Sequence, residues 1–462
     1  MGMVFKNQAL PSTKESLMDP KIRLNNDAPK ETIDQDYLNR KPFVNIVTGL
    51  IKENIETPYS IGIYGDWGSG KTTIMNFVKD SIEKETNYLT LWFDAWEYEN
   101  EKNLIYPLIR LIRNCIPKEK IESVKENIKK LSTVLLKASS DVILHKLTFG
   151  GINAEKIEKY GLEYEKAHTS RFDEWIDMIG KSRNAFKQLV ETACEKNEKQ
   201  YLVFFIDDLD RCLPENAIKI LEGIKNIFSD GNCIFVIALD RETIARGIKN
   251  RCPTLTKNEC KDYLDKIINF GLEVPELELD DFEKYIICLH DDLHIAKYNN
   301  LIREFSTICI SSRFHNPRKL KRIFNKYFLL IKISKEKKFN IKLLNTESKD
   351  GSNGELWQYN NNRDILSYLF LYEFWNDLYR LALADNEVIN LLNKHIDASN
   401  FRELIEVLKG YPIGPSLEKY IRNDYFKNFW LQCFRGKGKE INIDSTRFNE
   451  LIRMGQLIGL KK

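Results

Sequence analysis

The chain has 462 residues, of which 43% are hydrophobic and 30% charged, so it is long enough to bury at least one large core. Its 70 basic and 67 acidic side chains leave a formal net charge of +3, which argues against a dedicated nucleic-acid binder. The net charge does not exclude a basic face on one part of the protein. Nine cysteines without a C-x-x-C pair favour reduced thiols, and neither a secretory leader nor a long uncharged apolar run occurs. We therefore expect a soluble, cytoplasmic protein without a membrane segment.

Four short runs rich in β-branched and aromatic residues predict strands at 60–65, 88–96, 201–207 and 233–240. Three of them are almost continuously apolar, as expected for strands of a parallel sheet that is covered on both faces. Each run is followed by sequence with helical periodicity, and a helix is also expected within 36–53. The pattern predicts an α/β fold of three αβα layers, with a parallel sheet between two layers of helices.

The regions around this core differ from it in composition and are predominantly helical in pattern. We expect an N-terminal arm at 1–35, a core at 36–275, a charged helical insertion within it at about 115–200, a helical lid at 276–342, an exposed loop at 345–355 and a helical C-terminal domain at 356–462. In the last part, Ile365, Leu369, Tyr372 and Tyr379 fall on one face of a predicted helix, which favours core packing or a partner groove.

A phosphate-binding loop is predicted between the first strand and the helix after it. The stretch Gly65–Thr72 fits the pattern G-x-x-x-x-G-K-[ST], in which glycines let backbone N–H groups turn toward phosphate oxygens. Lys71 would reach the β- and γ-phosphates of a nucleotide, and the Thr72 hydroxyl would ligate Mg²⁺. We expect the nucleotide to be bound by Gly65, Asp66, Trp67, Gly68, Ser69, Gly70, Lys71, Thr72 and Thr73.

Acidic residues end the third predicted strand, where the second half of such a site is expected. Asp207 would hold Mg²⁺, and Asp208 would orient or polarise the attacking water. Because the predicted strand at 88–96 lies between the two motifs in the sequence, the core fits the larger ATPase division with an additional strand. Asp240, at the end of the fourth strand, either senses the γ-phosphate or caps the helix that follows it.

Four segments together resemble the KAP family of P-loop NTPases: GDWGSGKT at 65–72, WFDAWEYE at 92–99, IDDLDRCLPE at 206–215 and NPRKLKRIFN at 316–325. The tryptophans of the first two segments are the most specific features. The resemblance covers roughly residues 34–335 and implies ATP binding and hydrolysis, with Mg²⁺, by a core with a helical lid. It also implies a part in prokaryotic defence against phages or plasmids.

The resemblance carries over residue by residue to the motifs of this chain. It assigns Gly65, Gly70, Lys71 and Thr72 to the nucleotide loop, and Asp207 and Asp208 to the metal and to catalysis. Arg318 would be a lid arginine that faces the phosphates. One branch of the family has membrane hairpins between the two nucleotide motifs, whereas the insertion of this chain is charged.

Two other signals favour structural roles. His290 and His294 have the spacing of a zinc-protease motif, but Asp replaces the catalytic Glu and no third ligand is recognisable. Trp92 and Trp96 would point to the same face of a strand and pack against a neighbouring helix, although a place beside the nucleotide stays open.

The function expected from these features is that of an ATPase whose nucleotide state switches its assembly or its contacts in a defence system. Its partners would be copies of itself or proteins encoded nearby. The alternative is a nucleic-acid motor or loader, motivated by the basic run at 318–322, whose apolar residues would otherwise pack inward in a lid helix. A third hypothesis is a scaffold that binds nucleotide but scarcely hydrolyses it, because no arginine finger is obvious in the sequence.

Overall fold

The computed structural model describes residues 27–53, 56–101, 105–138, 180–226, 228, 230–251, 253–289, 299–335, 351–396, 419–420, 422–435 and 443–460. By its internal contacts the described chain falls into two compact units. The α/β unit holds 27–276 together with 316–318, and the helical unit holds 277–315 and the described residues from 319 onward. Most of the expected arm, the middle of the expected insertion, and the pair His290 and His294 lie outside the described residues.

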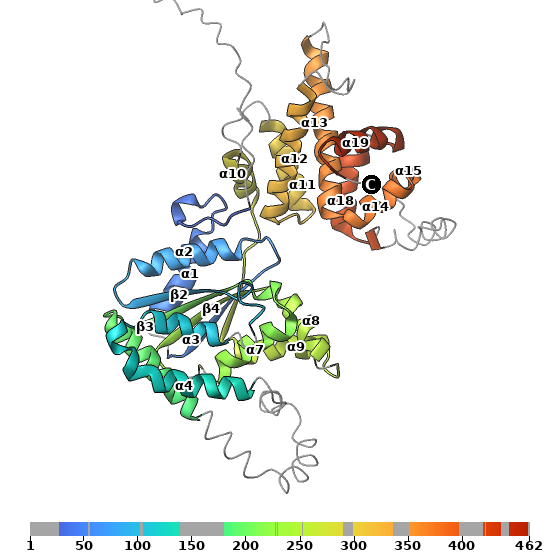
Figure 1. Ribbon diagram of the computed structural model, residues 1–462. Helices are drawn as coiled ribbons and strands as arrows, with labels where there is room; N and C mark the ends of the chain where they lie inside the picture. The colour runs from blue at the N-terminus through green and yellow to red at the C-terminus, as the bar shows by residue number, and fades with distance from the viewer. Residues whose placement is uncertain are drawn as a thin grey trace, which may run out of the picture. The chain divides into compact units, whose positions relative to one another are not determined.

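The α/β unit is built on a five-stranded parallel sheet (Figure 1). The strands are β1 (Tyr59–Tyr64), β2 (Tyr88–Asp94), β3 (Tyr201–Asp207), β4 (Cys233–Leu239) and β5 (Phe270–Glu273), in the order β2-β3-β4-β1-β5. Four strands lie where the sequence predicts them, with small shifts at their ends. The sequence did not reveal β5, because its four residues are mostly exposed and it is defined by its pairing with β1.

The strand that separates the two nucleotide motifs in the sheet is β4, not β2. It pairs on one side with β1, as in Ser60 opposite Phe235, and on the other with β3, as in Phe205 opposite Val236. The strand predicted at 88–96 lies between the two motifs in the sequence, but as β2 it lies at the edge of the sheet. Parallel strands are joined by crossovers, so a strand that lies between two others in the sequence need not lie between them in the sheet.

One face of the sheet is covered by two helices, α1 (Lys41–Lys52) and α2 (Lys71–Glu83). Alternate strand residues such as Ile61, Val203 and Val236 contribute to this core, because successive side chains of a strand point to opposite faces. Helix α1 was expected within 36–53 and begins at Lys41, with Pro42 in its first turn, where a missing N–H costs nothing.

The other face is covered by α7 (Pro214–Asn226), α8 (Arg241–Arg251) and α9 (Lys257–Ile267), together with the described parts of the insertion. Phe204 and Phe235, from neighbouring strands, stack on this side with ring centroids 5.2 Å apart. The three-layer αβα fold predicted from the sequence is therefore confirmed.

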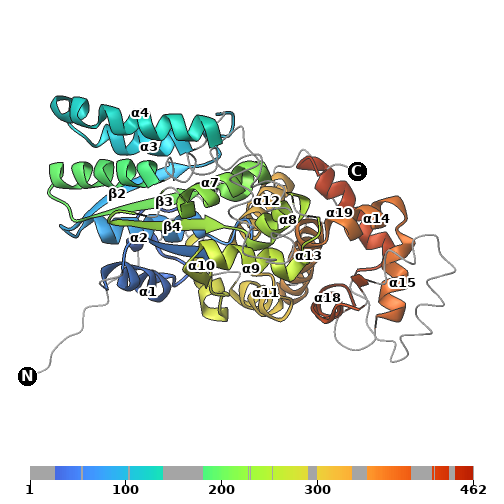
Figure 2. The same ribbon diagram turned by 90° about the horizontal axis from the view of Figure 1, so that it is seen from below.

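The described ends of the insertion complete this second layer. They form α3 (Ile105–Asn114), α4 (Ile121–Ala138) and the helical residues 180–196, which lie side by side in Figure 2. Val124 and Phe186 are buried in the same core as the strands, and a hydrogen bond joins the Asn127 amide to the Gln188 side chain. The insertion thus begins and ends as part of the core, because its apolar faces are needed to cover the sheet.

The helical unit packs around aromatic side chains. Its helices are α10 (Leu279–Leu289), α11 (Asn299–Ser311), α12 (Pro317–Lys335), α13 (Gly351–Phe374), α14 (Asn376–Ala384), α15 (Glu387–His395), α18 (Asp424–Trp430) and α19 (Ser445–Leu457), with a π-helical turn at Leu431–Arg435. The first two residues of α12 belong to the α/β unit. Phe314 contacts Phe374 and Phe429, at centroid distances of 4.0 and 5.4 Å. None of the described helices combines the length and hydrophobicity that crossing a bilayer requires.

Two expectations for this unit were wrong. Residues 351–355 were expected in a loop but form the start of α13, since intrinsic propensity is only a weak guide to helix ends. The aromatic stretch after them was expected as one helix, but it breaks at Trp375, whose φ of −128° and ψ of 56° are not helical. Ile365, Leu369 and Tyr379 are buried as expected, with Tyr379 on the second helix, α14.

Candidate nucleotide-binding site

The phosphate loop connects β1 to α2 with the backbone geometry that its glycines permit. Gly68 and Gly70 have φ angles of 89° and 100°, in the left-handed region that side chains with a Cβ rarely adopt. Ser69 N–H donates to the Asp66 carbonyl at 3.1 Å, which closes the turn, and Gly65 N–H donates to the Leu239 carbonyl of β4 at 3.3 Å. The loop is therefore held at the carboxyl edge of the sheet, at the start of α2, where a helix N-terminus favours an anion.

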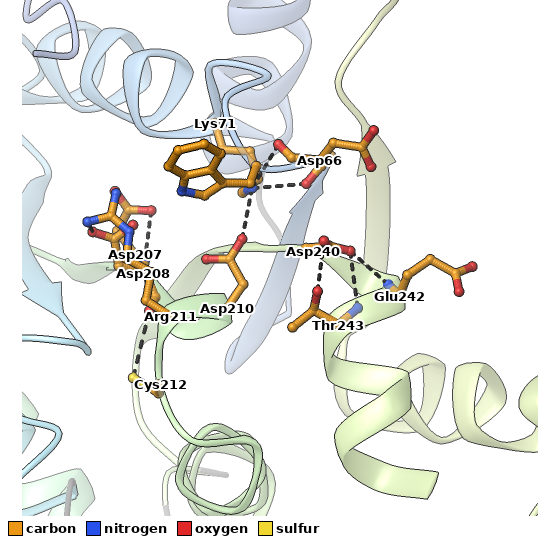
Figure 3. Close-up of polar contacts among 12 residues, drawn as sticks. Asp66, Lys71, Asp207, Asp208, Asp210, Arg211, Cys212, Asp240, Glu242 and Thr243 are labelled. Carbon is orange, nitrogen blue, oxygen red and sulfur yellow. Dashed lines mark hydrogen bonds and ion pairs between the residues drawn. The ribbon is translucent and has the colours of Figure 1, made fainter. Parts of the chain in front are cut away.

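Lys71 points into the loop and uses all three of its ammonium hydrogens (Figure 3). Its Nζ donates to the carbonyl oxygens of Gly65 at 2.9 Å and Asp66 at 3.3 Å. It also forms an ion pair with Asp210 Oδ2 at 3.1 Å, and both side chains are buried, at 8% and 7% exposure. The cation expected to bind phosphate is thus held inside the loop.

The side chains of Thr72 and Asp207, the two residues expected to hold Mg²⁺, lie close enough to interact. Asp207 ends β3 and is buried, and one of its oxygens accepts the Asp208 N–H at 2.9 Å. Burial raises the pKa of Asp207, while the interaction with Thr72 acts in the opposite direction. A hydroxyl and a carboxylate are hard oxygen ligands of the kind Mg²⁺ prefers, so the pair fits that ion.

Asp208 follows at the end of β3 with a left-handed backbone, φ 57°. Its carboxylate forms an ion pair with Arg211 at 2.9 Å. The guanidinium of Arg211 lies over the Trp96 ring, 5.3 Å from its centroid. Burial, and next the neighbouring Asp207, raise the pKa of Asp208 to about 7. The structure therefore places the expected catalytic acid beside the expected metal ligand and gives it a basic neighbour.

Trp96 does not share a strand face with Trp92, as expected from their spacing. Strand β2 ends at Asp94, whose carboxylate accepts the N–H groups of Trp96 at 3.0 Å and Glu97 at 3.3 Å and turns the chain. Trp92 is partly buried and stacks on Phe205, as expected, whereas Trp96 is 52% exposed beside Arg211.

Trp67 lies on the outer side of the phosphate loop and is 45% exposed. Its carbonyl oxygen accepts a hydrogen bond from the Asn316 amide at 2.7 Å, and the Arg318 guanidinium lies 4.4 Å from its ring centroid. Arg318 Nε is also 3.9 Å from Asp27 Oδ2. Arg318, which was expected to face phosphate, thus lies next to the phosphate loop and against the Trp67 ring.

Asp240 caps helix α8. Its carboxylate accepts the N–H groups of Glu242 at 2.9 Å and Thr243 at 3.2 Å, and also the Thr243 hydroxyl at 2.9 Å (Figure 3). The sequence left a cap and a phosphate sensor equally open for this residue, and the contacts are those of a cap.

Thr73, the last residue expected at the nucleotide, contacts another part of the chain. Its hydroxyl accepts the N–H of Lys30 at 3.4 Å, and the Asn76 amide donates to the Lys30 carbonyl at 2.9 Å. The described end of the expected arm therefore packs along α2.

The basic run at 318–322 lies in α12 as expected. Leu320 and Ile323, and Phe324 after them, are buried.

Sequence reasoning missed Asp210, the ion-pair partner of Lys71. The spacing of the acids in IDDLD could have indicated it. A 3₁₀ turn at Leu209–Arg211 brings Asp210, the third acid of this stretch, back toward the end of β3. It also gave no role to Arg211, since nothing local shows that Arg211 pairs with Asp208 and lies over Trp96.

Two known proteins are similar to parts of this chain to different degrees. The chain is 26% identical over 172 residues, 32% of its length and 88% of the relative's, to an uncharacterized protein of Methanocaldococcus jannaschii. The ORC2 protein of Aeropyrum pernix, solved as ADPNP–ADP complexes, aligns over 91% of this chain and 86% of its own, at 13% identity. Its TM-score of 0.28 is too low to bear on fold or function.

The family model described as the KAP family P-loop domain matches residues 40–330, well over half of the chain. That range contains the phosphate loop, the β3 acids and the segment at 316–318. The chain therefore belongs to the KAP family of P-loop NTPases.

Proposed function

We propose that this P-loop NTPase binds ATP with Mg²⁺ and hydrolyses it to ADP and phosphate. The observation that carries the proposal is that the phosphate loop meets the acids after β3, because Lys71 pairs with Asp210 at 3.1 Å and the Thr72 side chain interacts with Asp207. The buried Lys71 and the left-handed turn at Gly68 and Gly70 support it, because they give the loop a cation and inward-facing N–H groups.

Each side chain of the site would have a separate role in this reaction. Lys71 and the loop N–H groups would hold the β- and γ-phosphates, and Thr72 and Asp207 would hold Mg²⁺. The metal, when bound, neutralises charge on the phosphate oxygens. Asp208 would orient the attacking water, and its ion pair with Arg211 fixes the direction of its carboxylate. Asp240 and Arg318 play no part in this proposal, because their contacts are those of a helix cap and of a support for Trp67.

The biological part of the proposal is a nucleotide-dependent switch in defence against phages or plasmids, within the cytoplasm. Its support is the resemblance of the four motifs to a family often encoded with such systems. The switch would act on contacts with copies of the chain or with partner proteins. Plating phage on cells that express the wild type or Lys71→Ala tests this part, which fails if both give equal protection.

Phosphate release from ATP with and without Mg²⁺ tests the enzymatic part. We expect turnover by the wild type and a loss of at least about 100-fold in Asp208→Asn, in line with the effect of a positioned acid or base. Asp262→Asn is the matched control, since Asp262 is an exposed acid on α9. Equal rates for Asp208→Asn and the control would refute catalysis by this site. Strong stimulation by added DNA or RNA would instead favour the nucleic-acid motor.

A further inference from the structure

The ammonium of Lys71 has no hydrogen left to give to a phosphate. A lysine ammonium carries three donors, and they reach the carbonyls of Gly65 and Asp66 and the carboxylate of Asp210. The two carbonyls belong to the loop itself, so only the third contact comes from elsewhere in the fold. It is also the only one of the three that is charged. A phosphate that approaches Lys71 must therefore displace one of these three partners, and Asp210 is the one whose charge repels it.

Asp210 is placed to hold that position firmly. It lies on the turn Leu209–Arg211 directly after β3, and its side chain is 7% exposed. Charges that are this well buried are weakly screened by solvent, so the Coulomb attraction between the two charges is stronger than it would be on the surface. For the same reason, a phosphate and the Asp210 carboxylate would repel each other strongly if both lay beside Lys71.

We propose that Asp210 is an internal competitor for the phosphate-binding cation, and that nucleotide binds only as the ion pair between Asp210 and Lys71 opens. This inference rests on the proposed function, because it assumes that Lys71 binds the phosphates of a nucleotide. Asp210 would lower the affinity for nucleotide, as a carboxylate that competes with phosphate for the Lys71 ammonium, and would take no part in hydrolysis.

Opening the pair also has a consequence for the catalytic acid. The next residue on the same turn, Arg211, pairs with Asp208 and lies over Trp96. Arg211 N–H also donates to the Asp208 carbonyl at 3.2 Å, so Asp208 and Asp210 lie on one hydrogen-bonded turn. A movement of this turn on nucleotide entry would change the surroundings of Asp208 and so link nucleotide binding to the catalytic acid.

The test is the dissociation constant of ADP, measured by calorimetry in EDTA so that no metal takes part. Asp210→Asn keeps the size of the side chain and removes its charge. We expect it to bind ADP at least about tenfold more tightly than the wild type, the equivalent of about 1.4 kcal/mol. Without nucleotide its melting temperature should fall, because a buried lysine loses its anionic partner. Asp210→Glu, which keeps the charge, should stay close to the wild type.

Asp208→Asn is the control for a general effect of negative charge, since Asp208 lies in the same site but is paired with Arg211. Equal tightening in Asp208→Asn and Asp210→Asn, or weaker binding in Asp210→Asn, overturns the proposal. If Asp210→Asn does not fold, Asp210→Ser gives the same test with a smaller polar side chain.

Lys71→Ala separates the two proposals. If it binds ADP as well as the wild type, the proposed function fails. If it loses binding while Asp210→Asn shows no gain, the competition alone fails.

Discussion

Replacing Gly68 by alanine tests how closely residues 316–318 cover the phosphate loop. The Gly68 backbone is left-handed, and an added Cβ would lie 2.7 Å from Asn316 Oδ1 and 3.0 Å from Arg318 Cβ. The backbone strain alone costs about 1–2 kcal/mol for a residue with a Cβ. Relieving the clash moves the Asn316 amide away from the Trp67 carbonyl, which adds about 0.5–1.5 kcal/mol. We therefore expect Gly68→Ala to lower the free energy of unfolding of the α/β unit by about 1.5–3.5 kcal/mol.

Two other glycines provide matched controls. Gly70 is also left-handed, but an added Cβ meets nothing within 4 Å, so Gly70→Ala should cost only the strain of about 1–2 kcal/mol. Gly49 lies inside α1, with nothing within 4 Å of the added Cβ, and Gly49→Ala should stabilise the unit by about 0.5–1 kcal/mol.

Native-state hydrogen exchange of the amides in β1 and α2 is the suitable assay, because a chain with two units need not unfold in one transition. The expected order of stability is Gly49→Ala, wild type, Gly70→Ala and then Gly68→Ala. If Gly68→Ala costs no more than Gly70→Ala, Asn316 and Arg318 do not lie against the loop as described.

Three further predictions follow from single contacts. In urea unfolding, Asp240→Ala should lower the free energy of unfolding by about 0.5–2 kcal/mol. Asp240→Asn should lower it hardly at all, because asparagine also caps helices, and equal losses in the two variants would contradict a capping role. Trp67→Ala should weaken ADP binding by a factor of about 2–5, since Arg318 loses the ring it lies over, and unchanged affinity would show that the pair does not support the loop. Burial raises the pKa of the Cys212 thiol to about 12, so iodoacetamide at pH 8 should label the exposed Cys288 first; faster labelling of Cys212 would contradict its burial.

The parts of the fold that the sequence predicted are those fixed by local pattern. The strand at 201–207 is almost continuously apolar because both of its faces are covered, and such a run has few other interpretations. The phosphate loop was equally clear, because its glycines and its lysine have to occur at fixed spacing. The roles of Thr72 and Asp207 as metal ligands stay predictions, although the two side chains meet.

The parts that the sequence did not predict depend on contacts between distant segments. Strand β5 is recognised only by its pairing with β1, and the order of the strands follows from crossovers rather than from sequence order. The expected shared face of Trp92 and Trp96 failed because Asp94 ends the strand between them. The ion pair between Asp210 and Lys71 joins residues 139 positions apart, so the spacing in IDDLD can suggest a third acid near the strand end but not its partner.

The central claim is that the phosphate loop and the acids of β3 form one nucleotide and metal site. The most direct test is the dissociation constant of ATP, measured with and without Mg²⁺, for the wild type, Thr72→Val and Asp207→Asn. We predict that Mg²⁺ tightens binding to the wild type by at least about tenfold, or about 1.4 kcal/mol, and that either substitution removes this gain but leaves metal-free binding nearly unchanged. A gain from Mg²⁺ that is the same in all three proteins would contradict the claim.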